Sequence, residues 1–468
     1  MTNSKYILDT IYGLISVPGQ LFQFIDTPEF QRLRYIRQLG SSSYCFPTAN
    51  HTRFSHSIGA SHLAQSLFNR LVEPDDDLSR DGLALVTTAA LLHDLGHGPF
   101  SHLFETTIVP NIFGTSNCTS TSTSNGTHTS NGTHASSGTH SNSWTHEEQS
   151  LKMIDHLIDE NYIDLFDTSQ VKRLKAIATG SLVGEDRWLA QLVANHDFGI
   201  DVDRLDYLQR DCYHVGLNCG FNTSVLTSHI KRIDNQLSFH VKRQPELLNF
   251  FQTRYNLYHQ IYNNSQVRAV DHMISDILLE ANATNLINFE EALTCPDAFL
   301  TLTDSILEEV GRKSKRDSKV RQLLNRIHRR QFYKCIYNST KAPRLNLNQQ
   351  SDYDSTSVDA NETVSLLDSF TTSPTTTTPS NPLAMANTMM PCFLNRGFVR
   401  VTASDPTVAT PLLFESFKVN YGLGDSNPLL SVPFYNDHQS SSYYLTANDI
   451  NMIMPEKFEQ TYYRIYQI

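Results

Sequence analysis

The sequence lacks several features that would assign it to a structural class at once. Its seven cysteines are scattered, odd in number and never spaced as CxxC, which argues against a disulfide framework and a zinc ribbon. No apolar run approaches the roughly 18 residues of a membrane span, and no charged-then-apolar leader opens the chain. We therefore expect a reduced, intracellular protein of the nucleus or cytoplasm, with no membrane partner.

The sequence is also short of positive charge. It has 37 Lys and Arg against 48 Asp and Glu, a net charge of -11. This acidic balance argues against a protein whose main role is to coat nucleic acid. One basic helix is expected at residues 311–330, with a solvated or interface face, so nucleic-acid binding stays open as a secondary activity.

Two segments lack the apolar residues that a packed core requires. Residues 114–143 are almost entirely Ser, Thr, Asn, Gly and His, and residues 346–390 turn again to Ser, Thr, Asn and Pro. Burial there cannot offset the entropy of ordering, so both are predicted to be disordered. They divide the chain into a core at 1–345, interrupted by the first insertion, and a small α+β subdomain at 391–468.

A dense histidine segment, running from His93-Asp94 through His97 to His102, dominates the rest of the chain. It follows the apolar run 82–90, which predicts a buried helix with His93 and Asp94 in its last turn. An imidazole and a carboxylate at a helix end can bind one metal ion. A helix cap beside ordinary loop histidines is the alternative.

Two predicted helix starts carry charged or titratable groups. Arg53 and His56 are three residues apart, so a guanidinium and an imidazole can face one cavity. His146 follows Thr145, a potential cap, and lies where the helix dipole favours a nearby anion. Read alone, His56 would more often be an ordinary helix-start histidine.

Two further helix faces combine acidic, basic and phenolic groups. Asp203, Tyr207 and Asp211 recur every four residues, so one face offers two carboxylates and a phenol. A salt-bridged surface helix is the alternative. A long helix predicted over residues 247–281 has a comparable face, made of Arg254, Tyr258 and Tyr262.

Other elements follow from capping and alternation. A helix is predicted from Pro28 up to Gly40, because Asp26 or Thr27 can cap it and glycine stops it. The tail alternates like strands around 398–401 and 417–422, and a helix is expected through 455–458.

These pieces resemble one family. His56, His93-Asp94 and Asp203 reproduce the H…HD…D pattern of the HD-domain metal-dependent phosphohydrolases. The neighbouring motifs are similar to the deoxynucleoside triphosphate triphosphohydrolase branch, whose animal members also carry a SAM domain; they are residues 30–36, 53–57, 93–102, 144–147, 199–203 and 454–458. The resemblance implies a mainly α fold with an HD-domain helical catalytic core, and we expect no SAM domain here.

The resemblance also implies chemical roles. The metal ligands would be His56, His93, Asp94 and Asp203, a donor set suited to Fe, Mn, Zn or Ni, with Mg accompanying the nucleotide phosphates. Proton transfer would involve His97, His102 and His146, oriented by Asp201 and Glu105. The implied substrate contacts are Gln38, Leu39, Arg53, Arg204, Tyr207, Asp211, Arg254, Tyr258, Tyr262 and Asn263.

These roles define an expected reaction. The arginines would neutralise the triphosphate, and water would attack the α-phosphorus to release intact triphosphate and a deoxynucleoside. Tyr207 and Tyr262 would exclude ribonucleotides, and Gln38 and Asp211 would hold the 3′-hydroxyl. The chain departs from the family pattern where it has Arg204 for lysine, Tyr258 for histidine and Asn263 for glutamine.

Regulation is implied by a second residue set. Lys5, Asp26, Gln31 and Arg34 match the family's guanine-specific effector pocket, at which GTP or dGTP promotes assembly. We therefore expect a homo-oligomer, dimer to tetramer, with a regulatory or oligomerisation role for residues 391–468. A second, dNTP effector pocket is poorly matched by Val225, Gln260, Asn264 and Ser265, so its activation is expected to be altered or absent.

Two other functions stay open. Arg204 and Tyr258 leave room for an HD phosphohydrolase that acts on another phosphoester, such as a cyclic nucleotide or nucleoside monophosphate. The basic stretch and the biased segments suit a nucleic-acid-binding scaffold with a vestigial HD site. The complete set of four ligand residues argues against the scaffold.

Overall fold

The computed structural model describes residues 4–72, 81–113, 144–342, 398–401, 411–438, 441–450 and 453–468. The two segments predicted to be disordered, 114–143 and 346–390, lie outside these residues. The chain forms two compact units, Met1–Gln331 with Asn420–Phe458, and Phe332–Val419 with Glu459–Ile468. This division differs from the expected boundaries at 345 and 391, because β8 (Pro433–Tyr435) pairs in parallel with β4 (Gln236–His240) inside the first unit.

The first unit is mainly α, which confirms the predicted fold class. Its α-helices are α1 (Phe22–Ile25), α2 (Pro28–Gln31), α3 (Arg53–Leu71), α4 (Asp81–Leu92), α5 (Val109–Phe113), α6 (His146–Glu160), α7 (Thr168–Ala178), α8 (Arg187–Val193), α9 (Val202–Val215), α10 (Thr223–Thr227), α11 (Gln244–Leu257), α12 (Ser265–Ala283), α13 (Phe289–Thr294), α14 (Pro296–Leu300), α15 (Ile306–Lys313) and α16 (Lys319–His328). Two small sheets accompany them: the antiparallel hairpin of β1 (Lys5–Asp9) and β2 (Gly13–Val17), and a sheet in the order β3-β4-β8-β9, with β3 at Ile230–Ile233 and β9 at Tyr443–Tyr444.

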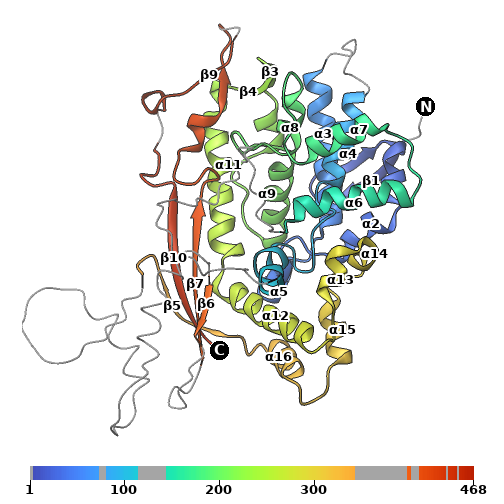
Figure 1. Ribbon diagram of the computed structural model, residues 1–468. Helices are drawn as coiled ribbons and strands as arrows, with labels where there is room; N and C mark the ends of the chain where they lie inside the picture. Colours follow the sequence, from blue (N-terminus) through green and yellow to red (C-terminus); the bar gives the residue numbers. More distant parts are fainter. Residues whose placement is uncertain are drawn as a thin grey trace, which may run out of the picture. The chain divides into compact units, whose positions relative to one another are not determined.

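The core of this unit is built on α4, which packs against α3 and α7, while α3 also packs against α9 (Figure 1). Helix α4 is apolar on nearly every side, and Val86, Ala89 and Ala90 are completely buried. A helix of this kind must be enclosed by others. The packing brings one end of α4 close to the beginnings of α3 and α9.

Two predicted helices are shorter in the structure. Helix α4 ends at Leu92, so His93 and Asp94 follow the helix instead of forming its last turn. The helix expected from Pro28 to Gly40 stops at Gln31 and continues as a 3-10 turn. Here Arg32 turns inward and donates hydrogen bonds to backbone carbonyls of distant segments, which local periodicity does not reveal.

Three other helix predictions were wrong in extent or type. The helix over 247–281 is interrupted by a π-helical turn, Tyr258–Tyr262, and Asn264 then caps α12. The basic helix at 311–330 is two helices, since Ser318 caps α16 and starts a new one. Residues 455–458 are not helical; they lead into a strand.

The second unit contains a four-stranded sheet in the order β5-β10-β7-β6 (Figure 1). The strands are β5 (Lys334–Ser339), β6 (Phe398–Val401), β7 (Leu412–Asn420) and β10 (Glu459–Gln467). The strand predicted at 398–401 is confirmed. Within the described part of the chain, no helix combines the length and apolarity needed to cross a membrane.

Candidate active site

The four predicted metal ligands gather around one point. His56, His93 and Asp94 each offer one ligand atom within 4.8 Å of the others. Asp203 adds a carboxylate, with its Oδ1 3.1 Å from His56 Nε2 and 3.5 Å from His93 Nε2. Helices α3 and α9 and the turn after α4 therefore supply one metal group.

Hydrogen bonds orient both histidines of the metal group. The Nδ1 atom of His56 lies 2.8 Å from Oδ2 of Asp206, and that of His93 lies 2.8 Å from the carbonyl oxygen of Ala90. An acceptor at Nδ1 keeps the proton on that nitrogen and leaves the Nε2 lone pair for a ligand. Both Nε2 atoms are buried and have no hydrogen-bond partner among the described residues. Two such nitrogens beside two carboxylates fit a divalent transition metal.

Neighbouring charges shift the pKa values of His56 and Asp94 in the metal group. Burial alone lowers the pKa of His56, but the carboxylates of Asp203 and Asp206 raise it to about 10. Burial opposes ionisation of Asp94, yet the guanidinium of Arg53, 2.5 Å away, holds the pKa of that carboxyl well below its usual range. Metal binding would therefore displace a proton from an imidazole and leave Asp94 as it is.

A second group of histidines lies beside the metal group. His97 stacks on His146 with ring centroids 4.1 Å apart, and His102 packs edge-on against both rings. Glu105 Oε2 lies 2.7 Å from Nδ1 of His146 and 3.6 Å from Nδ1 of His102. Burial raises the pKa of Glu105, but the two histidines outweigh it and lower that pKa. Glu105 is therefore an ionised partner that both histidines share.

Asp201 does not contact the histidines that Glu105 holds. It caps α9 by accepting a hydrogen bond from the backbone N–H of Arg204 and pairs with the guanidinium of the same residue. It also accepts from the backbone N–H of Asn195, at 2.8 Å. Of the two carboxylates expected to orient the histidines, the structure brings only Glu105 to them in the described contacts.

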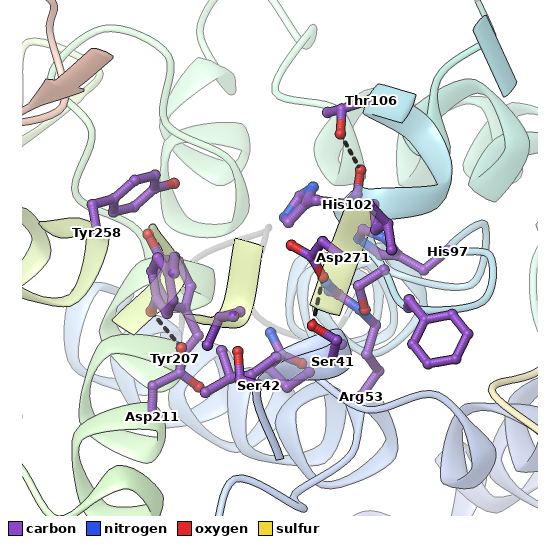
Figure 2. Close-up of a pocket in the computed structure, with 18 of the residues that line it drawn as sticks. Ser41, Ser42, Arg53, His97, His102, Thr106, Tyr207, Asp211, Tyr258 and Asp271 are labelled. Carbon is purple, nitrogen blue, oxygen red and sulfur yellow. Dashed lines mark hydrogen bonds between the residues drawn. The ribbon is translucent and has the colours of Figure 1, made fainter. Parts of the chain in front are cut away.

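A cavity of about 540 Å³ opens next to both groups, a size typical of a small-ligand site. All ten predicted substrate contacts line it, and Asp94, Asp203 and the three histidines border it. Figure 2 shows Tyr207, Asp211 and Tyr258 on one side and Arg53, His97 and His102 on the other, with Ser41 and Ser42 between them.

Neighbouring groups hold the charged lining in place. Arg53 donates from Nε to Oγ of Ser101, at 2.9 Å, besides pairing with Asp94. Arg254 donates to the carbonyl oxygen of Asn420, at 2.8 Å, and its guanidinium carbon lies 4.3 Å from the ring centroid of Tyr258. Both guanidinium groups are therefore held in place in the cavity lining.

Sequence reasoning missed several groups that line the cavity or hold its residues in place. His51 Nε2 lies 2.7 Å from Oδ1 of Asp211, whose other oxygen accepts a 2.5 Å hydrogen bond from the Tyr262 hydroxyl. Asp271 pairs with Arg268 and accepts from Ser41. No local pattern marks these partners. Asp206 could have been found, because it stands three residues after Asp203 and must face the same side of α9.

The four predicted effector residues lie outside the cavity lining. Lys5 and Asp26 form an ion pair of 3.8 Å, and Arg34 donates to Gln31 at 2.7 Å. Gln31 also donates to the carbonyl oxygen of Ile25, next to Asp26. They therefore form a surface cluster that is separate from the cavity lining.

Comparisons with known proteins agree with this geometry. The HD domain profile matches residues 53–211, which contain the whole metal group. The chain is 28% identical to the deoxynucleoside triphosphate triphosphohydrolase SAMHD1 homolog of Dictyostelium discoideum, over 99% of this chain and 77% of that protein. It is 28% identical to deoxynucleoside triphosphate triphosphohydrolase SAMHD1 of Homo sapiens, over 99% of this chain and 70% of that protein.

A mimivirus protein provides a partial match. HD domain-containing protein L394 of Acanthamoeba polyphaga mimivirus is 28% identical over 66% of this chain and 64% of its own length. The chain therefore contains an HD domain, and over nearly its full length it is similar to deoxynucleoside triphosphate triphosphohydrolases.

Proposed function

We propose that this chain hydrolyses deoxynucleoside triphosphates to a deoxynucleoside and inorganic triphosphate, and so controls dNTP levels. One observation carries the proposal: a single cavity is bordered by Asp94 and Asp203 of the metal group, by arginines and by tyrosines. Its shape and charge suit a triphosphate joined to a sugar.

The arginines of the cavity would bind the triphosphate. Arg53 and Arg254 are held by neighbouring acceptors, so they need no reorganisation as charge develops on the phosphates. Arg204 borders the same cavity while paired with Asp201. Arginine at this position keeps the positive charge that a lysine would supply.

The tyrosine side of the cavity would select the sugar. Tyr207 and Tyr262 would leave no space for a 2′-hydroxyl, while Asp211 and Gln38 would bind the 3′-hydroxyl. Asp211 is suited to this because His51 and Tyr262 fix its two oxygens.

The histidine group would handle the proton that the reaction requires. Water attacks the α-phosphorus, the P–O5′ bond breaks, and the leaving 5′-oxygen takes a proton. His102 is the proposed donor, since its side chain is 65% exposed at the cavity and Glu105 can stabilise its imidazolium form. His97 and His146 pack against that ring and hold its position.

The metal group would hold Fe, Mn, Zn or Ni, which would supply Lewis-acid activation at the phosphate, with Mg accompanying the other phosphates. The chain's contribution is to fix His56 and His93 by their Nδ1 contacts and to keep Asp94 ionised beside Arg53.

We extend the proposal to regulation. Guanine nucleotide, GTP or dGTP, would bind at the surface cluster of Lys5, Asp26, Gln31 and Arg34 and promote a dimer or tetramer. Residues 391–468 would take part in that assembly. An intracellular location, in nucleus or cytoplasm, and secondary nucleic-acid binding belong to the same proposal.

The test is to incubate Mn- or Fe-loaded protein with each dNTP, with and without GTP, and to separate the products by anion exchange. The expected products are deoxynucleoside and intact triphosphate, from dNTPs but not from NTPs. Monophosphate with pyrophosphate, or no turnover in metal-loaded protein, would contradict the proposal and favour another phosphoester or a binding role.

Two variants test whether the activity depends on the metal group. His93→Ala should lower turnover at least about 100-fold, because it removes one metal ligand. His438→Ala removes an exposed histidine that does not line the cavity and should keep wild-type turnover. Equal activity of the two variants would exclude the assigned metal group.

A further inference from the structure

Asp9 stands at the end of β1, where the hairpin turns, yet it is only 8% exposed. Its Oδ1 accepts hydrogen bonds from the backbone N–H groups of Ile11 and Tyr12, at 2.7 and 3.0 Å, which fixes the turn. Its Oδ2 lies 3.0 Å from NH1 of Arg210. A buried ion pair therefore ties the hairpin turn to α9.

Arg210 extends this contact to the metal group. Its Nε and NH2 donate to the two oxygens of Asp206, each at 2.9 Å, in a bidentate arrangement. Asp206 Oδ2 lies 2.8 Å from Nδ1 of His56. A continuous line of contacts, Asp9–Arg210–Asp206–His56, thus joins the hairpin to a proposed metal ligand.

Arg210, Asp206 and His56 are all buried, so the loss of any one contact affects the others. Arg210 is 1% exposed, and Asp206 and His56 are fully buried. Removing one partner of a buried ion pair leaves an uncompensated charge, which the rest of the line must accommodate by moving. Without Asp9, the guanidinium of Arg210 would pair with Asp206 alone. Arg210 could then shift, and Asp206 would lose its fixed orientation.

The Arg210–Asp206 pair fits closely between α3 and the hairpin. At Gly59, on α3, a Cβ atom would overlap both the carboxylate of Asp206 and the guanidinium of Arg210. The hairpin turn adds Tyr12, whose ring centroid lies 5.9 Å from the guanidinium carbon of Arg210. Helix α3 and the hairpin together enclose the pair.

We propose that Asp9 is a positioning residue of the metal site, which orients His56 through Arg210 and Asp206 so that the β1–β2 hairpin sets metal affinity. This inference rests on the proposed metal site at His56. A direct hydrogen-bond partner of a metal-binding histidine changes affinity about 10- to 100-fold when it is removed. Asp9 acts one ion pair farther away, so its effect is expected to be smaller, about fivefold.

The experiment measures Mn²⁺ affinity of the metal-stripped full chain by competition with a chelator. Asp9→Asn keeps the shape and removes the charge; it should weaken binding about fivefold, and Asp206→Asn about 10- to 100-fold. Glu415→Gln is the matched control, since it neutralises a buried carboxylate of the second unit and should keep wild-type affinity. Wild-type affinity in Asp9→Asn, with Asp206→Asn weakened, would overturn the inference.

Two further readouts separate positioning from stability. Saturating Mn²⁺ should restore dNTP turnover in Asp9→Asn, because every group that contacts substrate is present. If Asp9→Asn fails to fold, Arg210→Lys keeps the buried positive charge but cannot bridge Asp9 and Asp206 with a rigid fork, so it should fold and also weaken Mn²⁺ binding; wild-type affinity there would also overturn the inference. A wild-type chain that binds no Mn²⁺ would contradict the proposed function instead.

Discussion

At the scale of single residues, Gly59 shows how closely the site is packed. Replacing it with Ala would force a Cβ into the space of Asp206 and Arg210. We expect Gly59→Ala to lower stability by about 1–3 kcal/mol and to weaken Mn²⁺ binding. Urea unfolding and chelator competition measure the two effects. Ala60→Gly, the neighbouring change on the same helix, is the control for helix propensity and should keep wild-type affinity.

A second residue, Asp304, makes the stability of the fold depend on pH. Burial raises the pKa of Asp304 from 3.8 to about 6, although its oxygens accept hydrogen bonds from the backbone N–H groups of Phe100 and Arg37. The folded state thus holds the proton more tightly than the unfolded chain. Stability from this proton is fully present below pH 3.8 and is lost as the pH rises through about 6.

Asp304→Asn should remove this dependence. Between pH 4 and pH 7, the free energy of unfolding of the variant should rise relative to wild type by up to about 3 kcal/mol, two pKa units at 1.36 kcal/mol each. Urea unfolding across this pH range provides the measurement. Parallel pH profiles for both proteins would contradict the assignment.

At the scale of elements, the β1–β2 hairpin has one apolar face that is exposed among the residues the structure describes. Leu8 and Leu14 face each other across the strands and are 80% and 68% exposed, whereas Ile15 and Val17 on the other face are buried. We interpret this exposed apolar pair as a candidate interaction surface. Lys5, from the proposed effector cluster, lies on the same strand.

If GTP promotes assembly as proposed, we expect Leu8→Ser with Leu14→Ser to reduce the accompanying rise in mass. Light scattering with and without GTP measures the assembly, and the monomer should keep its helical circular dichroism. Val183→Ser changes an exposed apolar residue outside the hairpin and should assemble as wild type does. Unchanged assembly of the double variant would place the interface elsewhere.

At the scale of the whole molecule, metal and stability are linked. A metal that binds only the folded chain adds about 2.7 kcal/mol at 100 times its Kd. Chelation should lower the Tm by several degrees, and Mn²⁺ should restore it. His93→Ala, in which the group is incomplete, should show a much smaller response. If neither chelator nor Mn²⁺ changes the Tm of the wild-type chain, the proposed metal site is contradicted.

Much of this molecule follows from its sequence. The mainly α fold follows from helical apolar periodicity and from uninterrupted apolar runs such as the one that becomes α4. The metal group and the cavity lining could be named because His56, His93-Asp94 and Asp203 match the ordered motif of a known family, and the resemblance implied the other residues. Spacing along a helix showed only which side chains share a face, and it left the alternatives open.

Only the tertiary structure decided the rest. Asp9 and Arg210 are 201 residues apart, and Arg32 donates to a carbonyl 270 residues away. Asp201 pairs with Arg204 instead of a histidine, and residues 420–458 pack in the first unit. Contacts over such separations leave no periodic trace in the sequence, because packing of distant segments, and not local spacing, brings those groups together.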